Sequence, residues 1–244
     1  MNFAYRAGEI NEYIINIRRH IHAHPELSFN ERKTTAYIAD KLEEMGVEVQ
    51  RFDDYTGCIG TIRGRNGGKT VLLRADIDTL PIKECSGVEF ESENDGVMHA
   101  CGHDMHTAML LGAAQLLQEY RSELNGTVRL VFQPDEEGFT GAKTMLAAGV
   151  LENPKPQAGF ALHVNSGTPS GLVLCICGSG TFMAGCTLFR ITAHGVGCHG
   201  AMPETGVDPI NIAAHIYLSL QEIVSREFAA KTPLVVTIGK FSAG

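Results

Sequence analysis

The sequence contains no tryptophan and no apolar run long enough to cross a membrane. Its longest nearly apolar stretch, residues 108–117, is far shorter than the about 20 residues that a membrane-spanning helix needs. The first residues, MNFAYRAGEINEY, lack the apolar core of a secretion signal. We therefore predict a cytoplasmic protein that has no membrane partner.

Positive charge is also scarce in this chain. The 244 residues include 20 Lys and Arg against 28 Asp and Glu, which gives a formal net charge of −8. Because a nucleic-acid-binding surface needs clustered basic residues, we predict no nucleic-acid partner. Hydrophobic residues make up 44% of the chain, which is enough for a sizeable buried core and excludes a disordered chain.

A complete disulfide framework is excluded because the seven cysteines are an odd number spread along the chain. Reduced thiols are therefore expected, and metal binding or catalysis has to be considered for them. Histidine, in contrast, is abundant. The ten histidines include two tight groups: His20, His22 and His24, and His99, His103 and His106.

Two amphipathic helices are predicted near the start of the chain. Isoleucines recur at helical spacing from Ile10 to Ile21, and Pro25 prevents this helix from continuing. Ser28 and Glu31 have the spacing of a capping box, which predicts that a second helix begins there. Gly46 suits the left-handed position after its last turn.

Strands and helices then alternate, which predicts an α/β fold. Apolar runs at residues 47–49, 58–63, 70–78, 127–133 and 158–164 are typical of strands, and residues 104–120 and 142–148 have helical patterns. This order predicts a largely parallel, twisted sheet with helices on both faces. We assign residues 1–180 to this domain.

The pattern changes after about residue 180. Residues 172–178, 186–195 and 234–241 read as strands, and a long helix is predicted over residues 208–228. The chain ends directly after the last of these strands. Residues 181–244 are therefore expected to form an incomplete α/β sandwich.

Ionisable residues follow three of the predicted parallel strands. They are Asp76 and Asp78, then Asp135, Glu136 and Glu137, and finally His163. Polar residues after a single strand are readily explained by a solvent-exposed loop. Here three strands are each followed by such residues, and the carboxyl ends of parallel strands meet at the edge where α/β proteins bind ligands. We therefore predict a site at this edge.

Cys101 and His103 are two residues apart, so in an extended segment their side chains project to the same side. Glu136 and Glu137 are neighbours, which in extended backbone point in opposite directions, one toward a metal and one toward solvent. With His163 these residues form a mixed sulfur, nitrogen and oxygen set that suits Zn²⁺, Mn²⁺, Co²⁺ or Ni²⁺.

Single members of this group also fit simpler roles. A lone Cys101 would more often be a small buried hydrophobic residue. His106 is a rival ligand on the first helical turn, and Asp104 is either a hydrogen-bond acceptor for a ligand or a helix cap. For both residues the structural role is favoured. His20 and His22 are explained by favourable positive charge at a helix C-terminus.

Several motifs together resemble one family of enzymes. The stretches, in chain order, are HAHPELSFNE, LLRADIDTLPI, GVMHACGHDMHTA, VFQPDEEG, ALHV and HGAMPETGVDPI. They resemble the aminoacylase-like bimetal amidohydrolases, a metallopeptidase group that includes hippurate hydrolase, N-acyl-L-amino acid amidohydrolases, indole-acetyl-amino-acid hydrolases and N-acetyldiaminopimelate deacetylase. The resemblance implies a di-metal catalytic domain in residues 1–180 and a lid domain, also used for homodimerisation, in residues 181–244.

The resemblance also implies a role for each matching residue. Cys101 would bridge two divalent metal ions, with His103 and His163 on one ion and Glu137 on the other. Glu136 would be the general base. Asp78 matches an aspartate that steadies the metal centre.

The same resemblance extends to the lid. His199 matches a lid histidine that helps to stabilise the oxyanion from the partner protomer. Glu204 stands where family members commonly have a second histidine, so no substrate contact is assigned there.

The implied reaction is hydrolysis of the amide bond of an N-acyl amino acid by metal-activated water. Two alternatives remain. The family chain completes the lid and supplies another metal histidine after the point where this sequence stops, so the chain is expected to be a fragment and could be an inactive binding module. A related exopeptidase or dipeptidase is the other alternative, although such relatives usually bridge their metals with aspartate.

Overall fold

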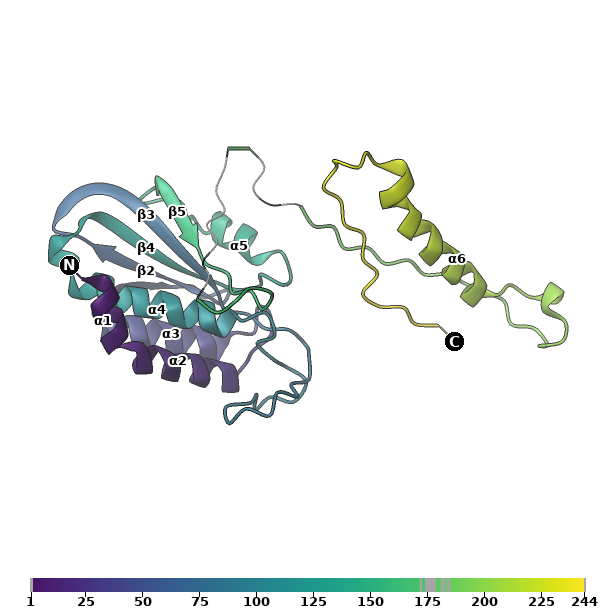
Figure 1. Cartoon of the computed structure of the whole chain (residues 1–244), viewed down its shortest axis with the longest axis horizontal. Helices are drawn as coiled ribbons and strands as arrows, with labels where there is room; N and C mark the ends of the chain where they lie inside the picture. Colours follow the sequence, from purple (N-terminus) through teal and green to yellow (C-terminus); the bar gives the residue numbers. More distant parts are fainter. Residues whose placement is uncertain (1, 172, 174–178, 181–182, 184, 244) are drawn as a thin grey trace. The chain divides into compact units, whose positions relative to one another are not determined.

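The structure is a computed structural model that describes residues 2–171, 173, 179–180, 183 and 185–243. The chain divides into two units, Met1–Leu172 and Val173–Gly244. The first unit contains a sheet and most of the helices (Figure 1). In the part of the chain that the structure describes, no helix is both long and apolar enough to cross a membrane.

The first unit is built on a five-stranded mixed sheet with the order β1-β2-β4-β3-β5. Its strands are β1 (Glu48–Arg51), β2 (Cys58–Arg63), β3 (Asn66–Asp76), β4 (Asn125–Gln133) and β5 (Ala158–Ala161). The three strands that alternate with helices, β3, β4 and β5, pair in parallel, as the sequence predicts. β1 pairs antiparallel with β2, to which a short connection joins it as a hairpin, and β2 pairs antiparallel with β4. The α/β class is confirmed, and the sheet is mixed.

Helices cover both faces of this sheet (Figure 1). The larger core lies under α2 (Asn11–Ala23), α3 (Arg32–Glu44) and α4 (His103–Glu119), and α1 (Phe3–Glu9) packs beside them. On the other face, Met145 of α5 (Gly141–Ala147) packs against Ile59 and Val131. Alternate residues of β4 face opposite ways: Leu130 and Phe132 enter the larger core and Val131 the smaller one.

The predicted helices are confirmed, but the predicted capping box is wrong. Residue Glu26 caps α3 instead, since its carboxylate accepts the backbone N–H groups of Lys33 and Thr34 at 3.3 and 2.8 Å. Ser28 and Glu31 are used elsewhere, in contacts with residues far along the chain. Gly46 has the expected left-handed backbone, with φ of 76°.

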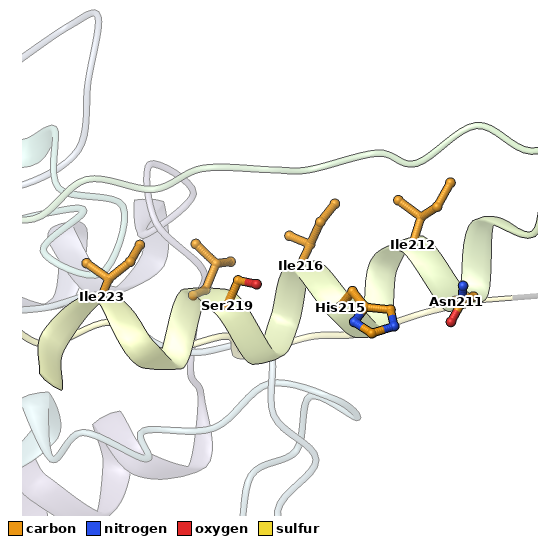
Figure 2. A pocket seen from close by; sticks show the side chains of 7 residues that line it. Asn211, Ile212, His215, Ile216, Ser219 and Ile223 are labelled. Carbon is orange, nitrogen blue, oxygen red and sulfur yellow. The ribbon is translucent and has the colours of Figure 1, made fainter. Parts of the chain in front are cut away.

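The second unit contains α6 (Pro209–Glu222), which confirms the predicted long helix, and the short helical turns Pro203–Thr205 and Ile223–Glu227. Asp208 caps α6 by accepting two backbone N–H groups. Isoleucines 212, 216 and 223 project from one face of this helical segment (Figure 2). Tyr217 contacts the ring of Phe241.

The strands predicted at residues 186–195 and 234–241 are not formed in the described part of the second unit. A strand exists only through ladder hydrogen bonds to a neighbour. The third predicted strand of this group, at residues 172–178, lies outside the described residues apart from Val173. Val196 and Val207 form an isolated antiparallel bridge.

A buried charged network ties α2 to the beginning of α4. His22 lies between two carboxylates: Nδ1 is 2.8 Å from Asp104 Oδ2, and Nε2 is 3.0 Å from Glu84 Oε1. Arg18 also pairs with Asp104, at 2.7 Å. Because ionised carboxylates only accept hydrogen bonds, these two contacts favour a proton on each ring nitrogen of His22 and hence the imidazolium form.

The bond to Asp104 raises the pKa of His22, although burial opposes this shift. Burial also works against the low pKa of Asp104, but the bond to His22 and the nearby positive charges hold that pKa below its usual range. The favourable effect of positive charge at a helix C-terminus therefore does not by itself explain His22. Its role in the fold is to pair with two buried carboxylates. His20, on the same helical turn, stacks on the ring of Tyr37.

We predict that His22→Gln lowers the free energy of unfolding by about 3 kcal/mol at pH 6, because two buried carboxylates lose their partner. Because the pKa of His22 is higher in the folded than in the unfolded state, His22 stabilises the fold fully below its unfolded pKa of about 6.5. This stabilisation is lost as the pH rises through the pKa of His22 in the folded state. The difference between wild type and variant should therefore shrink from pH 6 to pH 9 in urea titrations.

His24→Gln is the matched control, since the His24 side chain is 46% exposed. We expect this change to alter stability by less than about 0.5 kcal/mol. A His22→Gln effect that stays constant or grows with pH would contradict the buried imidazolium.

Candidate metal centre

The site lies at the carboxyl edge of the parallel strands, where the sequence predicts it. Asp78 follows β3, Glu136 and Glu137 follow β4, and His163 follows β5. His103 is the first residue of α4, which starts at the same edge. Segments that are far apart in the sequence thus bring ionisable side chains to one place.

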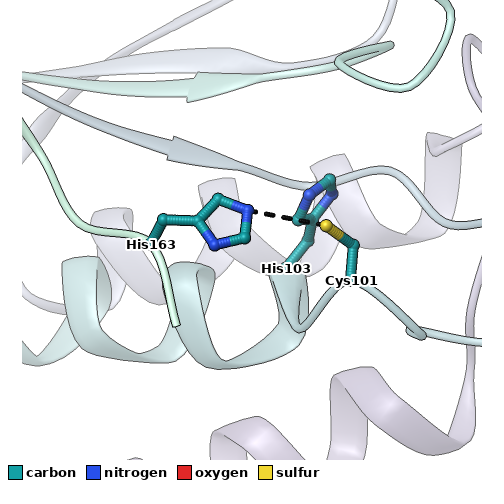
Figure 3. Close-up of side chains that lie close together, drawn as sticks. All are labelled: Cys101, His103 and His163. Atoms are coloured by element: carbon teal, nitrogen blue, oxygen red, sulfur yellow. Dashed lines mark hydrogen bonds between the residues drawn. The ribbon is translucent and has the colours of Figure 1, made fainter. Parts of the chain in front are cut away.

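Three donor atoms meet in the centre of this site (Figure 3). Cys101, His103 and His163 each offer one atom, and these atoms lie within 4.8 Å of one another. Cys101 Sγ is 3.5 Å from His163 Nε2. His103 is buried, Cys101 is partly buried and His163 is exposed, so the centre is open on the side of His163.

Cys101 and His103 come together for a different reason from the one the sequence suggests. They do not lie in an extended strand: Gly102 between them has a left-handed backbone, with φ of 84°, and forms the N-cap of α4. Glycine tolerates this conformation because it has no Cβ. The turn before the helix, rather than strand alternation, aims both donors at the same point.

Asp78 holds two parts of the centre in place. This carboxylate is 0% exposed. One oxygen lies 3.1 Å from His103 Nδ1, and the other accepts the backbone N–H of Glu137 at 3.0 Å and the hydroxyl of Ser28 at 2.9 Å. His103 Nδ1 also lies 2.9 Å from the carbonyl oxygen of Asp78.

These hydrogen bonds determine the protonation of His103 and Asp78. Because the partners of His103 Nδ1 are acceptors, Nδ1 carries the proton and Nε2 is left to face the centre. Burial disfavours the ionised form of Asp78, but the bonds from His103 and Glu137 nevertheless lower its pKa. Burial likewise opposes the raised pKa of His103, which the bond to Asp78 produces.

The two neighbouring glutamates both approach His103, which corrects the expectation that they point in opposite directions. Oε2 of Glu136 and Oε1 of Glu137 lie 3.9 and 4.0 Å from His103 Nε2. Their backbone is a turn, not a strand, and Asp135 before them has a positive φ of 48°. Burial, followed by the charges of Asp76 and Glu137, raises the pKa of Glu136.

Sequence reasoning missed Glu31, which shapes this turn. Glu31 is 0% exposed and accepts the backbone N–H of Asp135 at 3.1 Å and the hydroxyl of Thr56 at 2.5 Å. Burial raises its pKa. Glu31 and Ser28 belong to the HAHPELSFNE motif, so the sequence carries a signal for them, but their spacing also fits a local helix cap.

The donor set fits a divalent cation. Among the described residues, His103 Nε2 and Glu137 Oε1 are buried side-chain atoms without a hydrogen-bond partner, and both face the centre. Burial and the nearby carboxylates raise the pKa of the Cys101 thiol to about 12. A thiolate at this position would need a strong positive charge beside it, which a metal ion supplies.

Asp76 and His106 lie next to this group but have other partners. Asp76 forms an ion pair with Arg74 of β3. The backbone N–H of Val164 donates to His106 Nε2 at 3.0 Å. Of the two aspartates, it is Asp78 that bonds to His103 and to the backbone of Glu137.

His199 belongs to the second unit. It is exposed, and its Nδ1 accepts the backbone N–H of Ala201 at 3.1 Å. Its assignment to an active site stays a prediction from the sequence.

Comparisons with known proteins agree with the motifs. Residues 72–242 match the Peptidase family M20/M25/M40. The chain is 44% identical over 239 residues to thermostable carboxypeptidase 2 of Saccharolobus solfataricus, covering 97% of this chain and 60% of that protein. It is also 44% identical over 232 residues to N-acetylcysteine deacetylase of Bacillus subtilis, covering 95% of this chain and 60% of that protein.

A solved structure from Bacillus subtilis, described as a dinuclear metal binding peptidase from the M20 family, is 47% identical, with a TM-score of 0.63. The match covers 66% of this chain and 45% of that chain. The chain thus spans about 60% of the length of the curated relatives it matches. The family resemblance seen in the motifs is confirmed: the chain belongs to the Peptidase family M20/M25/M40.

Proposed function

We propose that the protein is a cytoplasmic amidohydrolase that cleaves the amide bond of N-acyl amino acids at a centre of two divalent metal ions. The observation that carries this proposal is the convergence of Cys101, His103 and His163, with their donor atoms within 4.8 Å, beside the unpartnered Glu137 Oε1. A site without a metal would leave two buried atoms, His103 Nε2 and Glu137 Oε1, without a partner, at a cost in stability.

Four side chains would hold the ions. We infer that Cys101 bridges them, that His103 and His163 bind one ion and that Glu137 binds the other. The mixture of sulfur, nitrogen and oxygen donors suits Zn²⁺, Mn²⁺, Co²⁺ or Ni²⁺. When bound, the ions supply polarisation of the amide carbonyl and a lowered pKa of the attacking water.

Glu136 would act as the general base. Its carboxylate reaches the centre but is 33% exposed, unlike the buried Asp78. Its raised pKa favours proton transfer near neutral pH, since a general base works best when its pKa is close to the working pH. Glu136 takes the proton from the attacking water and then donates it to the leaving amine.

The second unit enters the proposal through His199. We infer that residues 1–180 form the metal-binding catalytic domain and that residues 181–244 belong to a lid that also forms a homodimer. His199 from a second copy of the chain would then stabilise the developing oxyanion. The GCHGAMP sequence around His199 supports this inference.

The substrate class follows from the relative named N-acetylcysteine deacetylase, which is 44% identical to this chain. A second candidate is peptide hydrolysis, because an equally similar relative is named a carboxypeptidase. Both reactions attack an amide carbonyl, so the metal centre alone allows either. The group on the acyl side of the scissile bond distinguishes the two candidates.

We predict that the metal-loaded protein has a higher kcat/KM for N-acetyl and N-benzoyl amino acids than for dipeptides with the same C-terminal residue. Amine release measured after loading with Mn²⁺, Zn²⁺, Co²⁺ or Ni²⁺ compares the two classes directly. Faster dipeptide hydrolysis would favour the peptidase. Tight binding of metal without turnover of either class would favour a binding module.

Glu136→Gln should keep both metal ions and lose activity, because the amide cannot accept the proton from water. We expect kcat to fall by about 10²- to 10⁴-fold, measured on the best N-acyl substrate with metal content checked by elemental analysis. Glu123→Gln, at an exposed position of the same unit, is the control. A Glu136→Gln variant with unchanged kcat would remove the general-base role.

Cys101→Ala should lose metal, because the donor that bridges the two ions is removed. Elemental analysis after dialysis should find fewer than two ions per chain, whereas Cys85→Ala, which alters an exposed thiol, should match the wild type. Two tightly held ions in the Cys101→Ala variant would show that this thiolate is not the bridge.

A further inference from the structure

His106 is a buried imidazole beside the metal centre that the proposed mechanism does not use. It lies one helical turn after His103 on α4 and is 2% exposed. Its ring centre is 5.2 Å from that of His103 and 4.6 Å from that of His163. With Asp76 and His103 it forms a second group of side chains whose possible ligand atoms lie within 4.8 Å of one another, so His106 is a candidate metal ligand.

The hydrogen bonds of His106 argue against metal binding. Its Nε2 accepts the backbone N–H of Val164 at 3.0 Å, so the lone pair of this nitrogen is in use. A neutral imidazole with an acceptor Nε2 carries its proton on Nδ1. That Nδ1 lies 3.6 Å from Asp76 Oδ2, too far for a hydrogen bond, and has no hydrogen-bond partner among the described residues. Because Nε2 accepts the Val164 N–H and Nδ1 carries the proton, neither nitrogen has a free lone pair for an ion.

Val164 is held at two points and in turn holds His163. Its N–H is bound to His106, and its side chain packs against Gly102, where an added Cβ would lie only 2.4 Å from Val164 Cγ2. Its carbonyl oxygen accepts the Nδ1–H of His163 at 2.6 Å. This bond leaves His163 Nε2 as the acceptor nitrogen, and Nε2 is the atom that faces Cys101 Sγ (Figure 3).

His163 lies on an open part of the first unit. The residue is exposed, and the preceding strand β5 is exposed along its whole length and pairs with β3 over four residues. A side chain on such a segment loses rotational freedom when it binds a metal, unless the segment is already fixed. The contact from α4 to Val164 fixes it.

We propose that His106 is a positioning residue, which acts through Val164 to set the tautomer and the place of His163 opposite Cys101. The chain of contacts runs from Asp76 at the end of β3, through His106 on α4, to Val164 and His163 after β5. It therefore connects three separate segments along one side of the metal centre. The proposal rests on His163 being a metal ligand, as inferred under the proposed function.

The test compares two ways of replacing His106. His106→Leu introduces an apolar side chain of similar size and removes the acceptor, whereas His106→Gln supplies an acceptor oxygen that can reach the Val164 N–H. His106→Asn, which is too short to reach it, is a second removal variant in case the leucine variant does not fold. Leu111→Ala on the same helix is the control for a general loss of stability, because Leu111 is 0% exposed and lies further along α4 from the site.

Two measurements separate positioning from folding and from metal binding itself. The first is titration with Co²⁺, followed by the thiolate-to-cobalt absorption of Cys101. We expect His106→Leu to weaken Co²⁺ binding by about 10- to 100-fold at unchanged stoichiometry. His106→Gln should recover most of the affinity, and Leu111→Ala should lower the Tm without weakening Co²⁺ binding.

The second measurement uses metal-free protein. Hydrogen exchange of the Val164 amide should become about tenfold faster in His106→Leu, because its acceptor is gone. Nitrogen-15 NMR of the imidazoles should find the Nδ1–H tautomer of His163 in the wild type and a loss of that preference in the variant. Neither result depends on metal.

The outcomes distinguish this proposal from the one on which it rests. A wild-type protein that binds no Co²⁺ contradicts the metal centre, while the exchange of Val164 still tests the link to His106. Wild-type Co²⁺ affinity or unchanged Val164 exchange in His106→Leu would overturn the positioning role. Loss of one whole ion in both His106→Leu and His106→Gln would also overturn it, because His106 would then be a ligand.

Discussion

The arrangement of the centre depends on the need to satisfy one buried carboxylate. Asp78 is 0% exposed, and an ionised carboxylate in the interior is unfavourable unless several donors surround it. Its donors are Ser28 before α3, His103 at the start of α4 and the backbone of Glu137 after β4. Satisfying this one charge therefore brings together three segments that are distant in the sequence.

A second buried carboxylate completes the same turn. Glu31 bonds to the backbone N–H of Asp135, two residues before the point at which Asp78 bonds to Glu137. The turn after β4 is thus fixed at both ends by carboxylates from other parts of the chain. This explains why Glu136 and Glu137 can both approach His103: the turn is shaped by its hydrogen bonds, not by strand alternation.

The elements of the first unit are predictable from the sequence because they depend on local patterns. The helical spacing of Ile17 and Ile21 gives one buried face, and the apolar run around Val131 is buried on both faces of the sheet, so that it contributes to both cores. Ligands bind at the carboxyl edge of parallel strands, and this rule predicts the edge of the sheet at which Glu137 and His163 lie, each close to His103. The errors concern polar residues whose partners lie far along the chain. Ser28 and Glu31 fit a capping box by spacing, but their partners are Asp78 and Asp135, about 50 and 100 residues away. Burial decides these roles, and spacing along the chain does not report burial.

The side chains around the centre become more exposed from one side of it to the other. His103 is 1% exposed and fixed by Asp78, whereas Glu137 and Glu136 are 22% and 33% exposed, and His163 is exposed. The buried side is closed by Asp78 and Asp104, which are both 0% exposed, so the open side of the centre is that of Glu136 and His163. Under the proposed function, the substrate would approach from this side, where Glu136 is the carboxylate that would serve as the general base. Because His163 is exposed, burial does not hold its side chain in place. The contact from His106 through Val164 takes over this positioning, although His106 itself binds no ion in the proposed centre.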